Sequence, residues 1–416
     1  MMITQTEDEA VAEDEVVLVD KEPQFRLGEL FRSRKESGAA GLPVLSVTMN
    51  DGLVHRDTLD RKTDGKLAPD EHLLIRKGDL AYNMMRMWQG ASGSAKQDGI
   101  VSPAYVVITP SDAIDPTFAS YWFKSTRMIH LFWAYSYGIT GDRLRLYYRD
   151  FAKIPVTVPS KNDQIRIGKM LAAADEQIAR TEDLIAAKQK LKKGLAQRLT
   201  TGELRFSDFR ESWTRRSLGN MGDCVSGGTP DTRRAEYWGG EHVWCTPSDI
   251  PNSSPVIRST ERTITDEGLK ASSATLVPSG ALIVCTRASV GECAIAGVPL
   301  ATNQGFKSLV FGEDVCPEFI YYSLIEQRHV LERLASGSTF REVSKRDFVR
   351  LELPVPQQIG EQQRIAAVLG CLDRNVELLQ TKLIALREIK RGLMQRLFAD
   401  STSEVRLARG ENRNAS

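Results

Sequence analysis

Two long segments of the chain carry apolar residues at the spacing of an α-helix that packs against one neighbour. In residues 357–400 the apolar positions recur in alternating steps of four and three: Ile365, Leu369, Leu372, Val376, Leu379, Leu383 and Leu386. A strand cannot use this heptad spacing, because its side chains alternate between faces with a period of two. We expect Ile389, Leu393 and Leu397 to continue the stripe after a shift in register.

The segment over residues 160–203 repeats this pattern. Its helix-packing positions are Ile167, Leu171, Ile178, Ile185, Leu191 and Leu195, with Thr181 and Lys188 where the other segment has leucine. Each helix should run about 40 residues, or about 60 Å. Two such helices can satisfy their narrow stripes by packing on each other antiparallel. We expect Asn162 or Asp163 to cap the first helix and Gly202 to follow its end.

The two segments are copies of one sequence. Gln164-Ile165-Arg166-Ile167 corresponds to Gln362-Gln363-Arg364-Ile365, and Lys193-Gly194-Leu195 corresponds to Arg391-Gly392-Leu393 at the same offset. A repeat of about 200 residues is far longer than the roughly 20–50 residues of a solenoid unit. The chain therefore contains a duplication on the scale of a domain.

The regions before the two helices are related more weakly. Arg149-Asp150-Phe151 parallels Arg346-Asp347-Phe348, and the Pro116 and Pro317 segments each open a short aromatic helix. Short apolar runs bounded by Gly, Pro and Ser predict strands, for example at 105–108 and 282–285. The prediction is an α+β fold with two globular α/β domains, separated by two long antiparallel, coiled-coil-like helices in a pseudo-twofold internal repeat.

These patterns also predict the domain boundaries. They are an acidic tail over 1–21, a first globular domain over 22–159, a helical spacer over 160–203, a second globular domain over 204–356, a second helical spacer over 357–400, and a C-terminal tail over 401–416.

Charge and composition narrow the classes of function. The net charge is +1, but the first 20 residues hold seven acids and no base, so the remainder is basic, near +8. The six cysteines form no Cys-x-x-Cys pair, and with five histidines they make no zinc set. No apolar run could cross a membrane and no secretory leader is visible. We therefore expect a cytoplasmic protein with no membrane partner and no metal site.

Several catalytic signatures are missing. The sequence has no Gly-x-x-x-x-Gly-Lys-Ser/Thr phosphate loop, no Asn-Pro-Pro-aromatic segment of an amino-methyltransferase and no Gly-x-Ser-x-Gly elbow. The clustered polar residues are instead Arg, Lys, Asn, Gln, Ser and Thr with aromatics, which can contact base edges and phosphates. We expect a recognition protein that is not an enzyme and holds no cofactor.

Specific motifs then resemble a known family, the specificity subunits of Type I restriction–modification systems. In the second globular region these motifs are Ser226-Gly227-Gly228-Thr229-Pro230, Tyr237-Trp238-Gly239-Gly240, Trp244, Ser248-Asp249-Ile250 and Asn303-Gln304. The first region looks like another subtype of the same target-recognition domain, with Gly78-Asp79-Leu80-Ala81-Tyr82-Asn83 but without the Gly-Gly-Thr-Pro element. The resemblance covers about residues 22–400.

The resemblance implies a mechanism and a set of partners. Each target-recognition domain would read one half of a bipartite site in double-stranded DNA, and the helices would set the unread spacer. Two methyltransferase (modification) subunits would dock on the chain, and a restriction and translocase subunit would join them. S-adenosylmethionine, ATP and Mg²⁺ would be bound by those partners.

Basic, amide and aromatic residues in loop-like stretches are the candidates for DNA contact. They are Arg86, Trp88, Arg143, Arg145 and Tyr147 in the first half, and Thr229, Arg287, Asn303, Gln304, Lys307, Arg341 and Lys345 in the second. A loop arginine can equally be a solvated surface charge. Asn303 and Gln304 could pair with adenine or cap a turn. We expect Gly227 and Gly228 to shape a loop, and Trp238 and Trp244 to belong to the core.

Two other classes of function remain open. The chain could be a non-catalytic coiled-coil scaffold or adaptor with two ligand-binding domains, because a heptad pair alone often serves that purpose. It could also be an enzyme fused to a recognition module, although the missing catalytic motifs disfavour this interpretation. Salt-sensitive binding to duplex DNA distinguishes the first alternative, and a methyl-transfer assay on the purified chain distinguishes the second.

Overall fold

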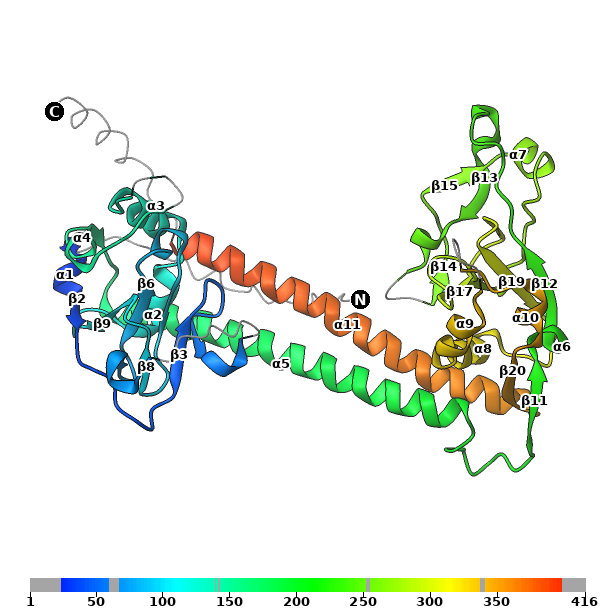
Figure 1. Ribbon diagram of the computed structural model, residues 1–416, viewed down its shortest axis with the longest axis horizontal. Helices are drawn as coiled ribbons and strands as arrows, with labels where there is room; N and C mark the ends of the chain where they lie inside the picture. The colour runs from blue at the N-terminus through cyan, green and yellow to red at the C-terminus, as the bar shows by residue number, and fades with distance from the viewer. Residues whose placement is uncertain are drawn as a thin grey trace, which may run out of the picture. The chain divides into compact units, whose positions relative to one another are not determined.

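The computed structural model describes residues 24–59, 67–138, 140, 143–251, 255–336 and 341–398. The expected tails over 1–21 and 401–416 lie outside this range. The chain folds into two compact units: unit 1 is Met1–Ile178 with Leu386–Ser416, and unit 2 is Ala179–Ala385. Each of the two long helices, which Figure 1 labels α5 (Lys161–Thr200) and α11 (Ile359–Leu397), is therefore divided between the two units.

Unit 1 is a mixed α and β structure with two four-stranded sheets and one strand pair. Its sheets run β2-β9-β6-β7, β4-β3-β8-β5 and β1-β10. The strands are β1 (Gln24–Arg26), β2 (Phe31–Arg34), β3 (Val44–Val47), β4 (Leu53–His55), β5 (Leu73–Ile75), β6 (Leu80–Asn83), β7 (Ser92–Ser94), β8 (Gly99–Val101), β9 (Tyr105–Pro110) and β10 (Pro155–Thr157). The helices are α1 (Leu27–Leu30), α2 (Pro116–Trp122), α3 (Thr126–Ala134) and α4 (Tyr148–Phe151), with 3-10 turns η1 (Arg56–Thr58), η2 (Pro69–Glu71) and η3 (Met87–Gln89).

Aromatic side chains fill the main core of unit 1. Phe31, Phe123 and Phe151 are fully buried and lie with ring centroids 5.3–6.0 Å apart. Helix α2 begins where the sequence predicts, because Asp115 accepts a hydrogen bond from Phe118 N and Pro116 occupies the first turn. The core thus fastens α2 to the sheet that contains β2 and β9.

Unit 2 combines a five-stranded sheet with a three-stranded sheet and one strand pair. The sheets run β12-β19-β16-β17-β14, β15-β13-β18 and β11-β20. The strands are β11 (Trp213–Ser217), β12 (Gly222–Ser226), β13 (Trp238–Cys245), β14 (Val256–Ile257), β15 (Arg262–Ile264), β16 (Leu282–Cys285), β17 (Cys293–Ala296), β18 (Leu300–Thr302), β19 (Phe306–Phe311) and β20 (Glu352–Pro356). The helices are α6 (Leu218–Met221), α7 (Asp266–Lys270), α8 (Pro317–Glu326), α9 (Arg328–Leu334) and α10 (Lys345–Arg350), with 3-10 turns η4 (Ala235–Tyr237) and η5 (Pro247–Asp249).

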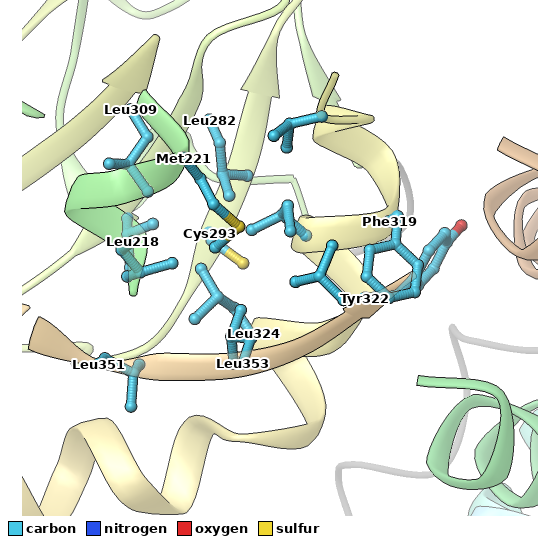
Figure 2. Close-up of a cluster of buried hydrophobic side chains, with 14 of the residues drawn as sticks. Leu218, Met221, Leu282, Cys293, Leu309, Phe319, Tyr322, Leu324, Leu351 and Leu353 are labelled. Carbon is cyan, nitrogen blue, oxygen red and sulfur yellow. The ribbon is translucent and has the colours of Figure 1, made fainter. Parts of the chain in front are cut away.

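The main core of unit 2 lies between α8 and one face of the five-stranded sheet. Figure 2 shows Leu282, Cys293 and Leu309 of the sheet beside Met221 of α6 and Leu324 of α8. Within the unit, β13, β15 and α7 gather at one end and β11 and β20 at the other (Figure 1). The apolar runs that predicted strands are therefore the buried centre of the sheet.

The same frame occurs in both units. The pair β1-β10 has its counterpart in β11-β20, and the order β2-β9-β6-β7 has its counterpart in β12-β19-β16-β17. The sheets differ in their other strands: unit 2 adds β14 at the edge of this sheet, and its second sheet has the three strands β15-β13-β18 where unit 1 has the four strands β4-β3-β8-β5. The mixed α and β class expected from the sequence is thus observed in each half.

Two long helices complete the units. Helix α5 is Lys161–Thr200 and helix α11 is Ile359–Leu397. The expected cap is wrong: Asn162 and Asp163 lie inside α5, and the hydroxyl of Ser160 accepts the hydrogen bond from Asp163 N. Gly202 follows the helix with a positive φ of 78°, as a C-terminal glycine should. No described helix is long and apolar enough to span a bilayer.

The helices pack antiparallel within each unit. In unit 1, Ile167 and Leu171 share a core with Leu393. In unit 2, Leu195 packs on the core that contains Ile365 and Leu369. The remaining predicted packing positions are all buried or half-buried: Ile178, Ile185, Leu372, Val376, Leu379 and Leu383.

The predicted stripe is wrong at one repeated position. Leu191 is 49% exposed and Ile389 is 57% exposed, although both were expected to continue the seam. The next residues, Lys192 and Lys390, take the inward position because a 3.6-residue helix drifts from a strict heptad. Their aliphatic stems cover apolar surface while their ammonium groups meet carboxylates.

Those lysines belong to a three-residue cluster that occurs once in each unit. In unit 1, Tyr121 donates a 2.7 Å hydrogen bond to Asp175, which also pairs with Lys390. Tyr322 donates an equal bond to Asp373 in unit 2, and Asp373 pairs with Lys192. Burial, with the bond to Asp373, raises the pKa of Tyr322. Each cluster joins α5, α11 and the helix that follows the sheet.

Candidate nucleic-acid interface

Loop segments far apart in the sequence meet at one edge of unit 2. Edge 2 consists of Thr286–Arg287, Asn303–Gly305 and Arg341–Val343. Its backbone is tightly paired: Arg287 bridges Glu342, and Val343 N donates to Thr286 O at 3.0 Å. The N–H groups of Thr286 and Arg287 both donate to Gly305 O, at 2.7 and 3.2 Å. These bonds hold the side chains of the three segments in a fixed arrangement.

Three charged side chains meet at edge 2. Glu342 accepts a hydrogen bond from Arg287 Nε at 2.7 Å, and the same oxygen lies 2.6 Å from Arg287 Nη2. Its other oxygen lies 3.6 Å from Lys307 Nζ. The side chain of Lys307 is only 7% exposed, whereas that of Arg287 is 44% exposed. Lys307 is therefore buried behind the carboxylate, and Arg287 can reach a ligand.

The other candidates of unit 2 lie around this edge with different roles. Asn303 accepts a hydrogen bond from Gly305 N at 2.8 Å, so its carbonyl caps a turn. Gln304 is exposed and accepts a hydrogen bond from Thr229. Arg341 and Lys345 are exposed. Of the two expected roles for Asn303, the structure favours the turn.

A half-buried thiol, Cys224, lies within the field of the lysines beside edge 2. Burial raises the pKa of Cys224 against the opposing fields of Lys345 and Lys307. A thiol with a raised pKa holds less of the reactive thiolate near neutral pH. Among the described residues no group of His, Cys, Asp and Glu is arranged to hold a metal ion.

The glycine and tryptophan motifs of unit 2 are structural. A Cβ on Gly228 would lie 2.4 Å from Ala274 N, and Gly228 O accepts a hydrogen bond from Trp244 at 2.9 Å. Trp244 is 3% exposed. Trp238 is half-buried, and the guanidinium of Arg262 lies 3.5 Å from its ring centroid. The motifs thus build a loop and an aromatic cluster.

Unit 1 has a counterpart edge, edge 1, formed by Met84–Arg86 and Arg145–Tyr147. Tyr137 and Arg145 form the same reciprocal backbone pair as Ser336 and Glu342, with bonds of 2.8–3.1 Å. Leu146 N donates to Met84 O at 2.8 Å, matching the bond from Val343 to Thr286. The backbone of the edge is therefore repeated, and its side chains are not.

Edge 1 borders a hollow of about 730 Å³. Its lining includes Arg34, Lys35, Met84, Tyr105, Tyr147 and Arg149. Hydrogen bonds with Asp79 raise the pKa of Arg34 despite its burial. Tyr147 is 41% exposed, and Lys35 and Arg149 are exposed. Aromatic and cationic side chains so placed can stack on bases and meet phosphates.

The remaining candidates of unit 1 are exposed or half-buried near this edge. Arg86 is exposed and donates to Gln89 at 3.3 Å. Trp88 is half-buried in η3 and donates to Met85 O at 3.0 Å, so its ring is held against the loop. Arg143 and Arg145 are exposed.

The sequence interpretation missed Glu342. It lies four residues before Arg346, as Arg145 lies four residues before Arg149, in the two matching Arg-Asp-Phe segments. Alignment of those segments therefore places Arg145 of the first half opposite Glu342 of the second. This difference in charge at one position of the repeat could have identified Glu342 from the sequence.

Comparison with known proteins matches the second half of the chain to a family. Residues 210–388 match the Type I restriction modification DNA specificity domain family. The specificity subunit of the Type I restriction enzyme MjaIX of Methanocaldococcus jannaschii is 34% identical over 193 residues, which are 46% of this chain and 44% of that protein. The EcoR124I/EcoR124II specificity subunit of Escherichia coli is 26% identical over 56% of this chain and 59% of that protein. The chain thus spans about half the length of these relatives.

Solved structures share the fold over a longer stretch. The S subunit of a Type I restriction–modification system from M. genitalium superposes with a TM-score of 0.57 at 18% identity, covering 94% of this chain and 99% of that one. The HsdS subunit of Thermoanaerobacter tengcongensis gives a TM-score of 0.52 at 18% identity, covering 93% and 98%. With the sequence match, these likenesses confirm the expected resemblance: residues 210–388 match the Type I restriction modification DNA specificity domain, and the chain shares its fold with solved specificity subunits of Type I systems.

Proposed function

We propose that this chain is the DNA-specificity subunit of a Type I restriction–modification complex. Unit 1 reads one half of a bipartite target in double-stranded DNA, and unit 2 reads the other. The observation that carries the proposal is the repeated edge, whose backbone pairs are the same and whose side chains differ. A protein that reads two unlike half-sites needs a common scaffold with two unlike surfaces.

The chemistry of the edges supports DNA as the ligand. Exposed arginines at both edges can meet phosphates or guanine, and Tyr147 beside the hollow can stack on a base. The basic balance of the chain beyond its acidic first 20 residues favours a polyanion.

The finer parts of the proposal follow the family. The helices set the length of the unread spacer, and two methyltransferase subunits dock on the chain, with a restriction and translocase subunit joining in the cytoplasm. Those partners supply S-adenosylmethionine, ATP and Mg²⁺, and the chain itself catalyses no reaction. The predicted domain boundaries at 22–159 and 204–356 are the recognition parts of this scheme.

A binding titration tests the proposal. Fluorescence anisotropy of the full chain with a mixed-sequence duplex should show affinity that falls linearly with the logarithm of salt concentration. Arg145→Gln should weaken binding to all sequences and lower the salt slope by about one. Arg166→Gln, at an exposed position of α5 where Arg166 pairs with Asp163, is the matched control. Salt-independent binding, or none, would favour the scaffold alternative.

A domain exchange tests modularity. Replacing residues 204–356 with the corresponding region of a relative should change one half of the methylated sequence only. A change in both halves would contradict independent reading by the two units.

A further inference from the structure

Unit 2 holds one arginine in a geometry that suits a planar ligand with two acceptors. Glu342 engages Nε and Nη2 of Arg287, which lie on one side of the guanidinium plane. The remaining edge, formed by Nη1 and the second Nη2 proton, therefore points away from the carboxylate. Two parallel N–H donors of this kind match the O6 and N7 acceptors of guanine in the major groove.

We propose that Arg287 reads a guanine in the half-site bound by unit 2, and that Glu342 is its positioning residue. This inference rests on the proposed function and names the base that edge 2 selects. The carboxylate orients the guanidinium and removes part of its freedom before DNA arrives, so less entropy is lost on binding.

The backbone at Arg287 is held more rigidly than a surface loop requires. Thr286 and Arg287 donate to Gly305 O, and Glu342 pairs with Arg287 in a bridge. The next residue, Ala288, has φ of 56° and is the one non-glycine residue with positive φ in the part of the chain that the structure describes. Strain of this kind persists where the surroundings determine the conformation, and it gathers at ligand-binding sites.

A purely structural ion pair accounts for less of this geometry. The side chain of Arg287 is 44% exposed, and ion pairs so open to water contribute little to stability. Glu342 also faces the buried ammonium of Lys307, so its charge is balanced by two cations. Lys307 partly neutralises the carboxylate from its buried side. Arg287 is therefore positioned by Glu342 and keeps donors that can bind a ligand.

The counterpart in unit 1 sets a limit on the inference. Met84 and Leu146 make the backbone bond that Thr286 and Val343 make in unit 2, which places Met85 and Arg145 where unit 2 has Arg287 and Glu342. Met85 is 44% exposed and cannot donate hydrogen bonds. The guanine requirement from this position therefore belongs to the second half-site alone.

The test is the methylated sequence made by the whole complex. The full chain is co-expressed with the methyltransferase subunits of its own system, and methylated sites in the host DNA are mapped. Wild type should require a G·C pair at one position of the second half-site. Arg287→Gln and Arg287→Lys should relax that position, with discrimination falling about 5- to 150-fold, and leave the first half-site unchanged. Arg287→Lys keeps the charge, so its failure to discriminate isolates the bidentate geometry.

Glu342→Gln distinguishes positioning from direct contact. It should keep the preferred base but lower discrimination, because an amide holds the guanidinium less firmly than a carboxylate. Arg215→Gln is the control, since Arg215 pairs with Glu352 on the β11–β20 pair, at 3.2 Å and 66% exposed. It should leave the motif unchanged.

Purified complexes provide the second measurement. Competition between the mapped target and a duplex with that G·C pair changed to A·T should show discrimination by wild type and its loss in both Arg287 variants. An unchanged motif in an active Arg287→Gln complex, or a second half-site without a required guanine, would overturn the inference and leave the proposed function intact. A wild-type complex that methylates no bipartite sequence would instead overturn the proposed function.

Discussion

Units 1 and 2 agree in the bonds that join sheet to helix and differ in the residues at their edges. Gln164 accepts from Asp115 N at 2.8 Å and donates to Ala113 O and Pro159 O at 3.1 and 2.9 Å. Gln362 makes the same three bonds, to Cys316 N, Asp314 O and Pro356 O, at 2.9, 3.1 and 2.9 Å. A buried amide that is fully bonded tolerates little change, whereas an exposed edge residue can change without loss of the fold.

The contrast shows how one frame can carry two different surfaces. Edges 1 and 2 share backbone pairs, yet Arg145 stands where Glu342 stands and Val106 stands where Lys307 stands. Charge at these positions is therefore decoupled from the core that supports them. Variants at matching positions of the two units test this comparison. In the frame they should lose similar amounts of folding stability, and at the edges they should differ in their effects.

Charge in the seam should produce the largest loss of stability. Leu369 and Leu171 are fully buried at equivalent positions of α11 and α5. Leu369→Asp and Leu171→Asp should each lower the free energy of unfolding by several kcal/mol, because each buries an unpaired carboxylate. Urea denaturation measures the change. Leu378→Asp and Met170→Asp, at exposed positions, are the controls and should change it little. An unaltered Leu369→Asp variant would show that the helices do not pack as described.

Loss of the buried amide should have the next largest effect. Gln362→Ala leaves Cys316 N and two carbonyls without their partner, and we expect a loss of about 2–4 kcal/mol. Gln164→Ala should lose a similar amount, since its bonds match. Gln363→Ala, exposed on the same turn, is the control. Thermal unfolding followed by circular dichroism measures the two losses of stability. If one loss were less than about half of the other, the two sets of bonds would not be equivalent.

Alkaline pH should lower the stability of unit 2 through its cysteines. Burial raises the pKa of the Cys293 thiol from 9.0 to about 12, and all six cysteines lie in unit 2. Because the folded pKa is the higher one, this stability is present below pH 9 and is lost as pH rises toward 12. By pH 10 the loss should be about 1 kcal/mol for this thiol.

The variant Cys293→Ala should flatten that pH dependence, measured as the free energy of unfolding in urea between pH 8 and pH 10. Cys371→Ala removes an exposed thiol and is the control. If the free energy of unfolding of Cys293→Ala falls with pH as steeply as that of the wild type, the thiol does not titrate as its burial requires.

The smallest effect should come from the Tyr-Asp-Lys clusters. Asp373→Asn should lower stability by about 1 kcal/mol, and Asp175→Asn by less, because the side chain of Asp373 is 18% exposed and that of Asp175 is 42% exposed. Raising the salt concentration should reduce both effects, and Asp175→Asn more. Thermal melts at low and high salt measure both effects. A larger loss for Asp175→Asn than for Asp373→Asn would show that solvent exposure does not control the strength of these pairs.

The helical pattern predicted most of the seam but not its register near the lysines. The heptad steps placed Ile365, Leu369 and Val376 inside, where the structure has them. Ile389 was expected to continue the stripe after a shift in register, but it is exposed, and Lys390 turns inward in its place because a 3.6-residue helix drifts from the heptad. Ser160 as the cap was missed since Asn162 and Asp163 offered equally suitable side chains one turn further on.

The candidate residues were found by type and sorted only by the fold. Arg287, Lys307 and Asn303 entered as one class of polar loop residue. The structure makes Lys307 a buried counter-ion, Asn303 a turn cap and Arg287 an exposed donor. Burial and hydrogen-bond partners distinguish these roles, and neither is written in residue type.

By itself, the sequence determined the duplication, the two long helices and the mixed α and β class, because periodicity and repetition are local properties of the chain. Only the tertiary structure decided that each helix is shared between two units, that the repeat extends to individual hydrogen bonds, and that Glu342 faces Arg287. Those facts depend on distant segments being brought together: Arg287 and Glu342, for example, are 55 positions apart in the chain. The spacing of side chains within one helix or strand does not indicate which distant segments it will contact.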